Sequence, residues 1–206
     1  MPRIDEIQRT DRKTTILDAA ERCFVRSGFH GATMAEICGE AGMSPGNLYR
    51  YFRSKEAMIE GLCERDLAEA AEGFEALATA DDLWASFRAL AYFHLVEEPR
   101  ASCGMWIEIM SEAARNPQIA ALRVKTDEFI YQQLYGALET ARARGHTEPH
   151  ADLERTVQFM ITFADGLMLR RVRDPDFDPV PHLEIMFDVM RSMLLTPLAP
   201  SNDNLT

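Results

Sequence analysis

Hydrogen-bonding side chains are concentrated in one short stretch of the chain, from Ser44 to Tyr51, which reads SPGNLYRY. Five of its eight residues carry a hydroxyl, amide or guanidinium group. Such groups donate to and accept from base edges in a DNA groove, and a glycine early in a helix lets the backbone approach the groove wall. Leu48 and Phe52 are four residues apart, as anchors in a core would be. The stretch therefore predicts either a DNA-reading surface or a helix corner whose tyrosines cover a core.

The residues around this stretch predict that it forms the second helix of a helix-turn-helix. Thr33 and Glu36 are spaced as a capping box, in which each side chain satisfies a backbone N–H group at the start of a helix. That first helix must end near Gly42, because glycine is favoured just past a helix end. Ser44 and Pro45 then start the second helix, with serine as N-cap and proline in the first turn. A helix pair joined by a glycine-containing turn is typical of DNA-binding domains.

The stretch from Thr14 to Leu62 resembles the DNA-binding domain of the TetR (tetracycline-repressor-like) family of bacterial transcriptional regulators. The matching positions occur in the family's order and spacing: Ile16, Leu17, Ala19, Ala20, Phe24, Gly28, Thr33, Ile37, Ala41, Gly42, Met43, Ser44, Leu48, Tyr49, Tyr51, Phe52, Ser54, Lys55 and Glu56. So many matches disfavour the helix corner. The resemblance implies that Thr33 and Lys55 contact DNA phosphates, and that six residues face the major groove or its walls: Ser44, Gly46, Asn47, Tyr49, Arg50 and Tyr51.

The same resemblance implies the partners, which are a palindromic double-stranded DNA operator, a small-molecule effector and a second copy of the chain. The charge distribution agrees with DNA binding at one end only. Residues 1–55 hold nine Lys/Arg and seven Asp/Glu, whereas residues 56–206 hold thirteen and twenty-six, so the net charge of −11 belongs to the second part. An anionic partner is therefore expected to dock on the N-terminal segment.

The chain predicts an all-α fold in two parts. Hydrophobic residues make up 47% and charged residues 27%, as in an ordinary globular protein, and no segment alternates β-branched residues as a strand would. We predict a three-helix helix-turn-helix DNA-binding domain over 1–55, a larger helical domain for effector binding and dimerisation over 56–195, and a disordered tail over 196–206. The expected helices cover about 10–27, 33–42, 44–51, 54–77, 82–97, 103–115, 118–144, 152–173 and 181–195.

The second part of the chain favours an apolar effector with at least one polar group. Aromatic and thioether side chains give adaptable apolar surface, although such residues at helical spacing are more often plain core. His94, Gln158 and Asp165 are the polar groups expected among apolar neighbours, with a satisfied core hydrogen bond as the alternative for each. The candidate effector-binding residues are Tyr92, His94, Trp106, Met110, Phe129, Gln158, Phe163 and Asp165.

The last two helices are too apolar for a solvent-facing terminus, which predicts that they pair with a second subunit. The candidate interface residues are Phe159, Gly166, Leu167, Phe187 and Met190. Further apolar residues on the same helices are Phe163, Ile185, Val189 and Met193. Dimerisation would also supply the second recognition helix that a palindromic operator requires.

Other classes of function are disfavoured by the residue types. No run of eighteen apolar residues occurs, so no membrane partner is expected, and the scattered histidines disfavour an all-α cytoplasmic enzyme. The four cysteines match no zinc spacing, which predicts reduced thiols in the cytoplasm, no metal site and no cofactor. Cys23 and Cys38 leave a redox-responsive regulator as an alternative. The main prediction is a transcriptional repressor that a small, largely apolar effector releases from its operator.

Overall fold

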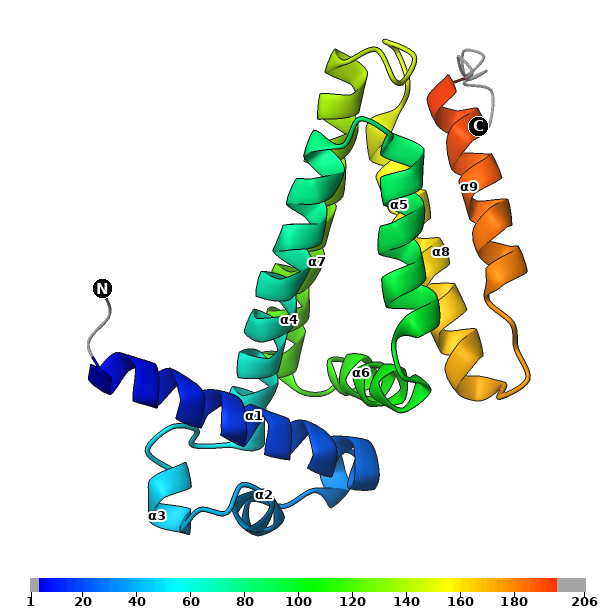
Figure 1. Ribbon diagram of the computed structural model, residues 1–206. Helices are drawn as coiled ribbons and strands as arrows, with labels where there is room; N and C mark the ends of the chain where they lie inside the picture. Colours follow the sequence, from blue (N-terminus) through cyan, green and yellow to red (C-terminus); the bar gives the residue numbers. More distant parts are fainter. Residues whose placement is uncertain (1–3, 196–206) are drawn as a thin grey trace. The chain divides into compact units, whose positions relative to one another are not determined.

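The computed structural model describes residues 4–195, and all regular secondary structure in that range is helical (Figure 1). The elements in chain order are α1 (Ile4–Gly31), α2 (Met34–Glu40), α3 (Pro45–Leu48), α4 (Lys55–Thr79), α5 (Leu83–Tyr92), the π-helix η1 (Phe93–Glu97), α6 (Arg100–Glu112), α7 (Pro117–Ala143), α8 (Leu153–Arg173) and α9 (Val180–Leu195). The predicted all-α fold is thus confirmed. The tail predicted for 196–206 lies outside the described residues.

The first helix is longer than the sequence predicted and is interrupted where the sequence placed its end. It begins at Ile4 rather than near Thr10. At Gly28 the backbone takes φ 72° and ψ 168°, a left-handed conformation that favours glycine. One further helical turn then reaches Gly31. The regular part of α1 therefore stops at the predicted glycine, and a short turn leads from it to the helix-turn-helix.

The local signals of the helix-turn-helix are confirmed. The Thr33 hydroxyl accepts from the Glu36 N–H at 3.2 Å, and the Thr33 N–H donates to Glu36 Oε2 at 2.8 Å, which completes the capping box of α2. Gly42 has a φ of 63° just past the end of α2. Ser44 is the N-cap of α3, but α3 ends at Leu48, and turns replace the rest of the helix expected over 44–51.

The first compact unit comprises Met1–Ala68 and Ala101–Thr126. Its core includes fully buried side chains from every helix of the unit: Ile16, Phe24, Ile37, Leu48, Met58, Leu62, Ile109 and Ile119. Within this unit, α6 and the first turns of α7 therefore share one core with the helix-turn-helix. The functional division of the chain at residue 55 stays a prediction, because packing alone does not say what each part binds.

The second compact unit comprises Glu69–Arg100 and Asp127–Thr206. Its core includes Phe74, Leu77, Phe87, Leu138, Val157, Leu183 and Met190. Within the unit α8 and α9 lie side by side (Figure 1). The Arg171 guanidinium donates to the carbonyl oxygens of Val96 at 3.0 Å and Glu98 at 2.9 Å, which satisfies carbonyl groups at the end of η1. No helix within residues 4–195 is long and apolar enough to cross a membrane.

Candidate functional site

The predicted recognition segment presents polar side chains to solvent and is anchored from below. Leu48 is fully buried and Phe52 is 7% exposed, so the two residues hold the segment on the first core. Asn47 and Tyr51 are half-buried, and Tyr51 packs against that core. The exposed members of the predicted set are Ser44, Gly46, Tyr49 and Arg50. Anchoring by Leu48 fixes the direction in which its neighbours project, which is what a reading surface needs.

Several polar groups of this segment have no partner within the described part of the chain. Ser44 makes no capping hydrogen bond, although it occupies the N-cap position. Tyr49 is 48% exposed, and Arg50 is exposed and lacks an ion pair among residues 4–195. Arg53 is exposed in the same way. Sequence reasoning missed Arg53, and the only available signal was its place between the anchor Phe52 and the start of α4.

The two predicted phosphate contacts, Thr33 and Lys55, have their donors engaged within the chain. The Thr33 hydroxyl donates to Glu36 Oε2 at 3.0 Å. The hydrogen bonds from the Thr33 N–H and from this hydroxyl lower the pKa of Glu36. The Lys55 ammonium donates to the carbonyl oxygens of Phe29 at 2.5 Å and Ala32 at 2.8 Å. Both side chains therefore organise the segment that leads into α2.

The predicted effector-binding residues belong to both compact units. Trp106 packs against the core that carries the helix-turn-helix, and Met110 belongs to the same unit. Four half-buried residues belong to the second unit: Tyr92, His94, Phe129 and Phe163. Burial lowers the pKa of His94, whose ring contacts Phe93 edge-on.

The other two polar candidates, Gln158 and Asp165, are exposed on α8. They do not lie in the core of the single chain, and their role in effector binding stays a prediction.

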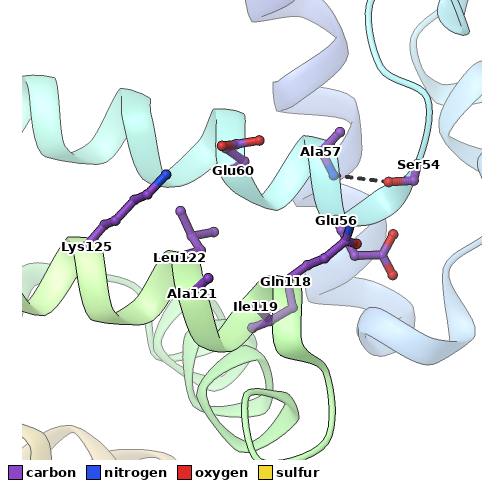
Figure 2. Close-up of a pocket in the computed structure, with 9 residues that line it drawn as sticks. All are labelled: Ser54, Glu56, Ala57, Glu60, Gln118, Ile119, Ala121, Leu122 and Lys125. Atoms are coloured by element: carbon purple, nitrogen blue, oxygen red, sulfur yellow. Dashed lines mark hydrogen bonds between the residues drawn. The ribbon is translucent and has the colours of Figure 1, made fainter.

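A pocket of about 290 Å³ lies between the first turns of α4 and α7 in the first unit (Figure 2). Its lining residues are Ser54, Glu56, Ala57, Glu60, Gln118, Ile119, Ala121, Leu122 and Lys125. None of the eight predicted effector-binding residues lines this pocket. The Ser54 hydroxyl beside it accepts from the Ala57 N–H at 3.2 Å and so caps α4. Glu60 and Lys125 are exposed, so this pocket is a surface depression with charges of both signs.

The predicted dimer interface contains residues that the chain uses in its own core. Leu167 and Phe187 are 3% exposed, and Met190 is fully buried, so these three side chains are not available to a second subunit. Phe159 is half-buried and Gly166 is exposed with open space around it. The sequence did not reveal which apolar stripe of each helix faces the chain's own core, since both stripes are apolar.

The large apolar side chains that α8 and α9 expose are Leu169, Ile185, Val189 and Leu195, at 50%, 54%, 37% and 43%. Ile185 and Val189 are one helical turn apart on α9. The sequence had counted them only among the further apolar residues of that helix.

The cysteines do not support the redox alternative. All four cysteines are buried, and none of them forms a disulfide within residues 4–195. Burial raises the pKa of Cys63 to about 11, and burial also raises the pKa of Cys23. Because the thiolate is the reactive form, a raised pKa disfavours reaction of these two thiols at neutral pH.

Comparison with known proteins agrees with the geometry. Residues 16–62 match the model for bacterial regulatory proteins of the tetR family, and residues 84–195, more than half of the chain, match the model for the C-terminal part of BetI-type transcriptional repressors. The transcriptional regulator UidR of Escherichia coli K12 is 31% identical over 160 residues, which cover 76% of this chain and 79% of UidR.

Solved structures of other proteins share this fold. Salmonella enterica GusR is 27% identical, with a TM-score of 0.76 over 89% of this chain and 95% of GusR. The complex of SmeT with triclosan is 18% identical, with a TM-score of 0.77 over 93% of this chain and 96% of SmeT, and shares the fold. The chain therefore belongs to the TetR family of bacterial transcriptional regulators: it is a ligand-responsive repressor, not an enzyme, and it binds operator DNA as a homodimer.

Proposed function

We propose that this repressor reads its operator through the exposed side chains of the α3 segment, placed in the major groove. The observation that carries the proposal is the pairing of a buried anchor, Leu48, with exposed neighbours Tyr49 and Arg50 that have no partner within residues 4–195. Tyrosine and arginine donate to base edges and phosphates, and an anchored helix keeps their register on the duplex. Ser44, Gly46 and the half-buried pair Asn47 and Tyr51 complete the proposed surface. Gly46 has open space around its Cβ position, so its backbone can approach the groove wall.

Phosphate contacts are proposed for Arg53, whose exposed guanidinium follows the recognition segment directly. Thr33 and Lys55 are proposed to support DNA binding by fixing the entry to α2, since their donors are engaged with Glu36 and with backbone carbonyl groups. Arg53 is thus proposed to position the protein on the DNA, whereas Thr33 and Lys55 hold the segment before α2 in place.

The dimer interface is proposed to lie on the surface of α8 and α9 that exposes Leu169, Ile185 and Val189. Exposed large apolar side chains on two adjacent helices favour burial against a second subunit. Gly166 has no atom within 4 Å of a Cβ position, so it leaves room for close approach of a partner helix. The dimer would carry two recognition segments for half-sites about 34–36 Å apart or a multiple of that.

The effector is proposed to be largely apolar and to bind in the second unit. Its binding is proposed to release the repressor from DNA in the bacterial cytoplasm. The half-buried rings of Tyr92, Phe129 and Phe163 support an apolar ligand. His94 supports a polar contact, because it is half-buried and has no hydrogen-bond partner within the described residues. Its lowered pKa keeps the imidazole neutral, so it would meet a hydroxyl or carbonyl group rather than an anion.

The test is a fluorescence anisotropy titration of operator DNA, taken from the region upstream of the protein's own gene, with Tyr49→Ala. We expect the variant to lose about 1–3 kcal/mol of specific binding while its affinity for random-sequence DNA changes little. Val124→Ala is the control, since Val124 is 69% exposed on α7 and has no proposed contact with DNA. Unchanged operator affinity in Tyr49→Ala would remove the proposed reading surface.

A further inference from the structure

Two glutamates one turn apart on α6 contact the segment that leads from α1 into the helix-turn-helix. Glu108 Oε1 accepts a hydrogen bond from the Phe29 backbone N–H at 2.9 Å. His30 Nε2 and Glu112 Oε2 share a hydrogen bond of 2.9 Å. The Glu112 side chain is only 8% exposed, and Arg115 Nε also donates to it at 3.0 Å. The carboxylates of α6 thus bind consecutive residues just before the capping box of α2.

The approach of Glu108 to this segment depends on Gly28. A Cβ atom at Gly28 would lie 2.8 Å from Glu108 Oε2, closer than real Cβ contacts, and 3.0 Å from Glu108 Oε1, so the carboxylate would have to move away. Gly28 also has a φ of 72°, which makes the following N–H point away from the helical ladder of α1. The left-handed turn therefore does two things: it frees the Phe29 N–H for Glu108 and leaves space for the carboxylate.

The same segment is held from its carbonyl side by α4. Lys55 Nζ donates to the carbonyl oxygens of Phe29 and Ala32, and lies 4.7 Å from the centroid of the Phe29 ring. A carboxylate, Glu108, accepts from the Phe29 backbone N–H, and the ammonium group of Lys55 donates to the backbone carbonyl groups. Each contact includes a charged group and is therefore stronger than a neutral hydrogen bond. Residues 28–32 are consequently fixed between α6 and α4, and the next residue, Thr33, is the N-cap of α2.

We propose that Glu108 and Glu112 are positioning residues for operator recognition: through them α6 fixes residues 28–32, and thereby the orientation of the helix-turn-helix. Neither glutamate is proposed to touch DNA. This inference rests on the proposed function, because it assigns to α6 a part in the DNA reading attributed above to α3. It also assigns a task to a helix that carries none of the residues predicted to contact DNA.

The direction in which affinity for DNA changes distinguishes this positioning role from a purely electrostatic effect of the glutamate charge. Removal of a negative charge from a DNA-binding unit raises affinity for DNA, because repulsion from the phosphates falls. Loss of the contact with Phe29 acts in the opposite direction, since the orientation of α2 and α3 becomes less defined. Glu64, an exposed glutamate of α4 in the same unit, offers a matched control that loses only the charge.

The experiment compares the full-length wild-type protein with Glu108→Ala, Glu108→Gln and Glu64→Ala. Each protein is titrated with a duplex that the wild type selects from a random-sequence library, and with poly(dI-dC) as non-specific DNA. Glu108→Ala is expected to lose at least about tenfold in affinity for the selected duplex, as for loss of a charge-assisted hydrogen bond, while its affinity for poly(dI-dC) stays equal or rises. Glu64→Ala is expected to keep or gain affinity for both.

Rescue by the conservative variant Glu108→Gln distinguishes the role of the hydrogen bond to Phe29 from the effect of truncating the side chain. Glu108→Gln retains a carbonyl oxygen that accepts from Phe29, so it is expected to recover most of the affinity for the selected duplex. Hydrogen exchange adds a direct readout: the Phe29 amide and α2 are expected to exchange faster in Glu108→Ala than in Glu64→Ala. If Glu108→Ala does not fold, Glu112→Ala is expected to give the same pattern through His30.

The outcomes divide cleanly. The proposal is overturned if Glu108→Ala behaves as Glu64→Ala does, or if it loses affinity for the selected duplex and for poly(dI-dC) by the same factor. Failure of the wild-type protein to prefer any duplex from the library would instead contradict the proposed function itself. The two failures are therefore distinguishable in one set of titrations.

Discussion

Lys55 Nζ lies 2.8 Å from the carbonyl oxygen of Ala32, which ties the first residue of α4 to the residue before the N-cap of α2. The same ammonium group donates to Phe29 O, at the end of the interrupted α1. A lysine at a helix end stabilises the carbonyl groups that have no partner within the helix. The first core and this contact together hold the three helices of the DNA-binding region.

Replacement of Lys55 by alanine is expected to lower the free energy of unfolding by about 1–3 kcal/mol, because it leaves backbone carbonyl groups without their charged donor. It is expected to leave the salt dependence of DNA binding almost unchanged. Arg53→Ala is the comparison variant, with the opposite pattern: unchanged stability, and a slope of log K against log salt that is shallower by about 0.9.

Urea unfolding and anisotropy titrations at several salt concentrations measure both quantities for Lys55→Ala and Arg53→Ala. If Lys55→Ala lowers the salt slope by about one phosphate contact without loss of stability, Lys55 contacts DNA directly, as the family resemblance implies. The internal role assigned to its ammonium group would then be incorrect.

The double substitution Ile185→Glu and Val189→Glu is expected to convert the homodimer to a folded monomer. Both side chains are exposed in the single chain, so the charges are tolerated there, but they would be buried without a partner in the dimer. Sedimentation velocity at micromolar concentration measures the change from about twice 23.3 kDa.

Two controls accompany this prediction. Val124→Glu adds a charge at a 69% exposed valine outside α8 and α9 and is expected to remain dimeric. Met190→Glu places a charge in the second core and is expected to unfold the chain rather than yield a monomer. If the double variant Ile185→Glu and Val189→Glu remains dimeric, the interface lies on another surface.

Stability is expected to decrease on mild acidification because of His94. Burial lowers the pKa of His94, so the unfolded chain takes up a proton below about pH 6.5 while the folded chain keeps a neutral imidazole. The free energy of unfolding is therefore highest above the pKa of His94 in the unfolded chain. It decreases as pH falls toward the pKa in the folded chain, by no more than about 1.4 kcal/mol per pH unit.

Urea unfolding at fixed protein concentration, at about pH 7.5 and about pH 5.5, tests this pH dependence. We expect His94→Gln to flatten it, and the exposed-histidine variant His150→Gln to retain it. Identical pH dependence in His94→Gln and the wild type would show that burial of this imidazole does not contribute.

The thiol of Cys63 is expected not to react in the native protein. Its pKa of about 11 leaves almost no thiolate at neutral pH, and its burial hinders access of reagents. Labelling with iodoacetamide followed by mass spectrometry should modify it only after unfolding in urea. Stoichiometric labelling of Cys63 in the native protein would contradict this prediction. Labelling of native Cys23 or Cys38, together with loss of operator binding after peroxide treatment, would restore the redox alternative.

The helix-turn-helix could be predicted from the sequence because its signals are local. Thr33 and Glu36 cap α2 across three residues, Gly42 ends it, and the spacing of Leu48 and Phe52 defines the buried side of the recognition segment. Each of these interactions joins residues within one or two turns, so their residue types and spacing are sufficient to specify them.

Only the tertiary structure decided which groups meet across long stretches of chain. The contacts of Lys55 with Phe29 and of Glu108 with Phe29 join residues that are 26 and 79 positions apart, and no spacing rule predicts such pairs. The α9 helix shows the same limit: its sequence is apolar around most of the circumference, so periodicity could not separate Met190, buried in the chain's own core, from exposed Val189. Burial is a property of what packs against a helix, and that neighbour is chosen by the whole fold rather than by the helix itself.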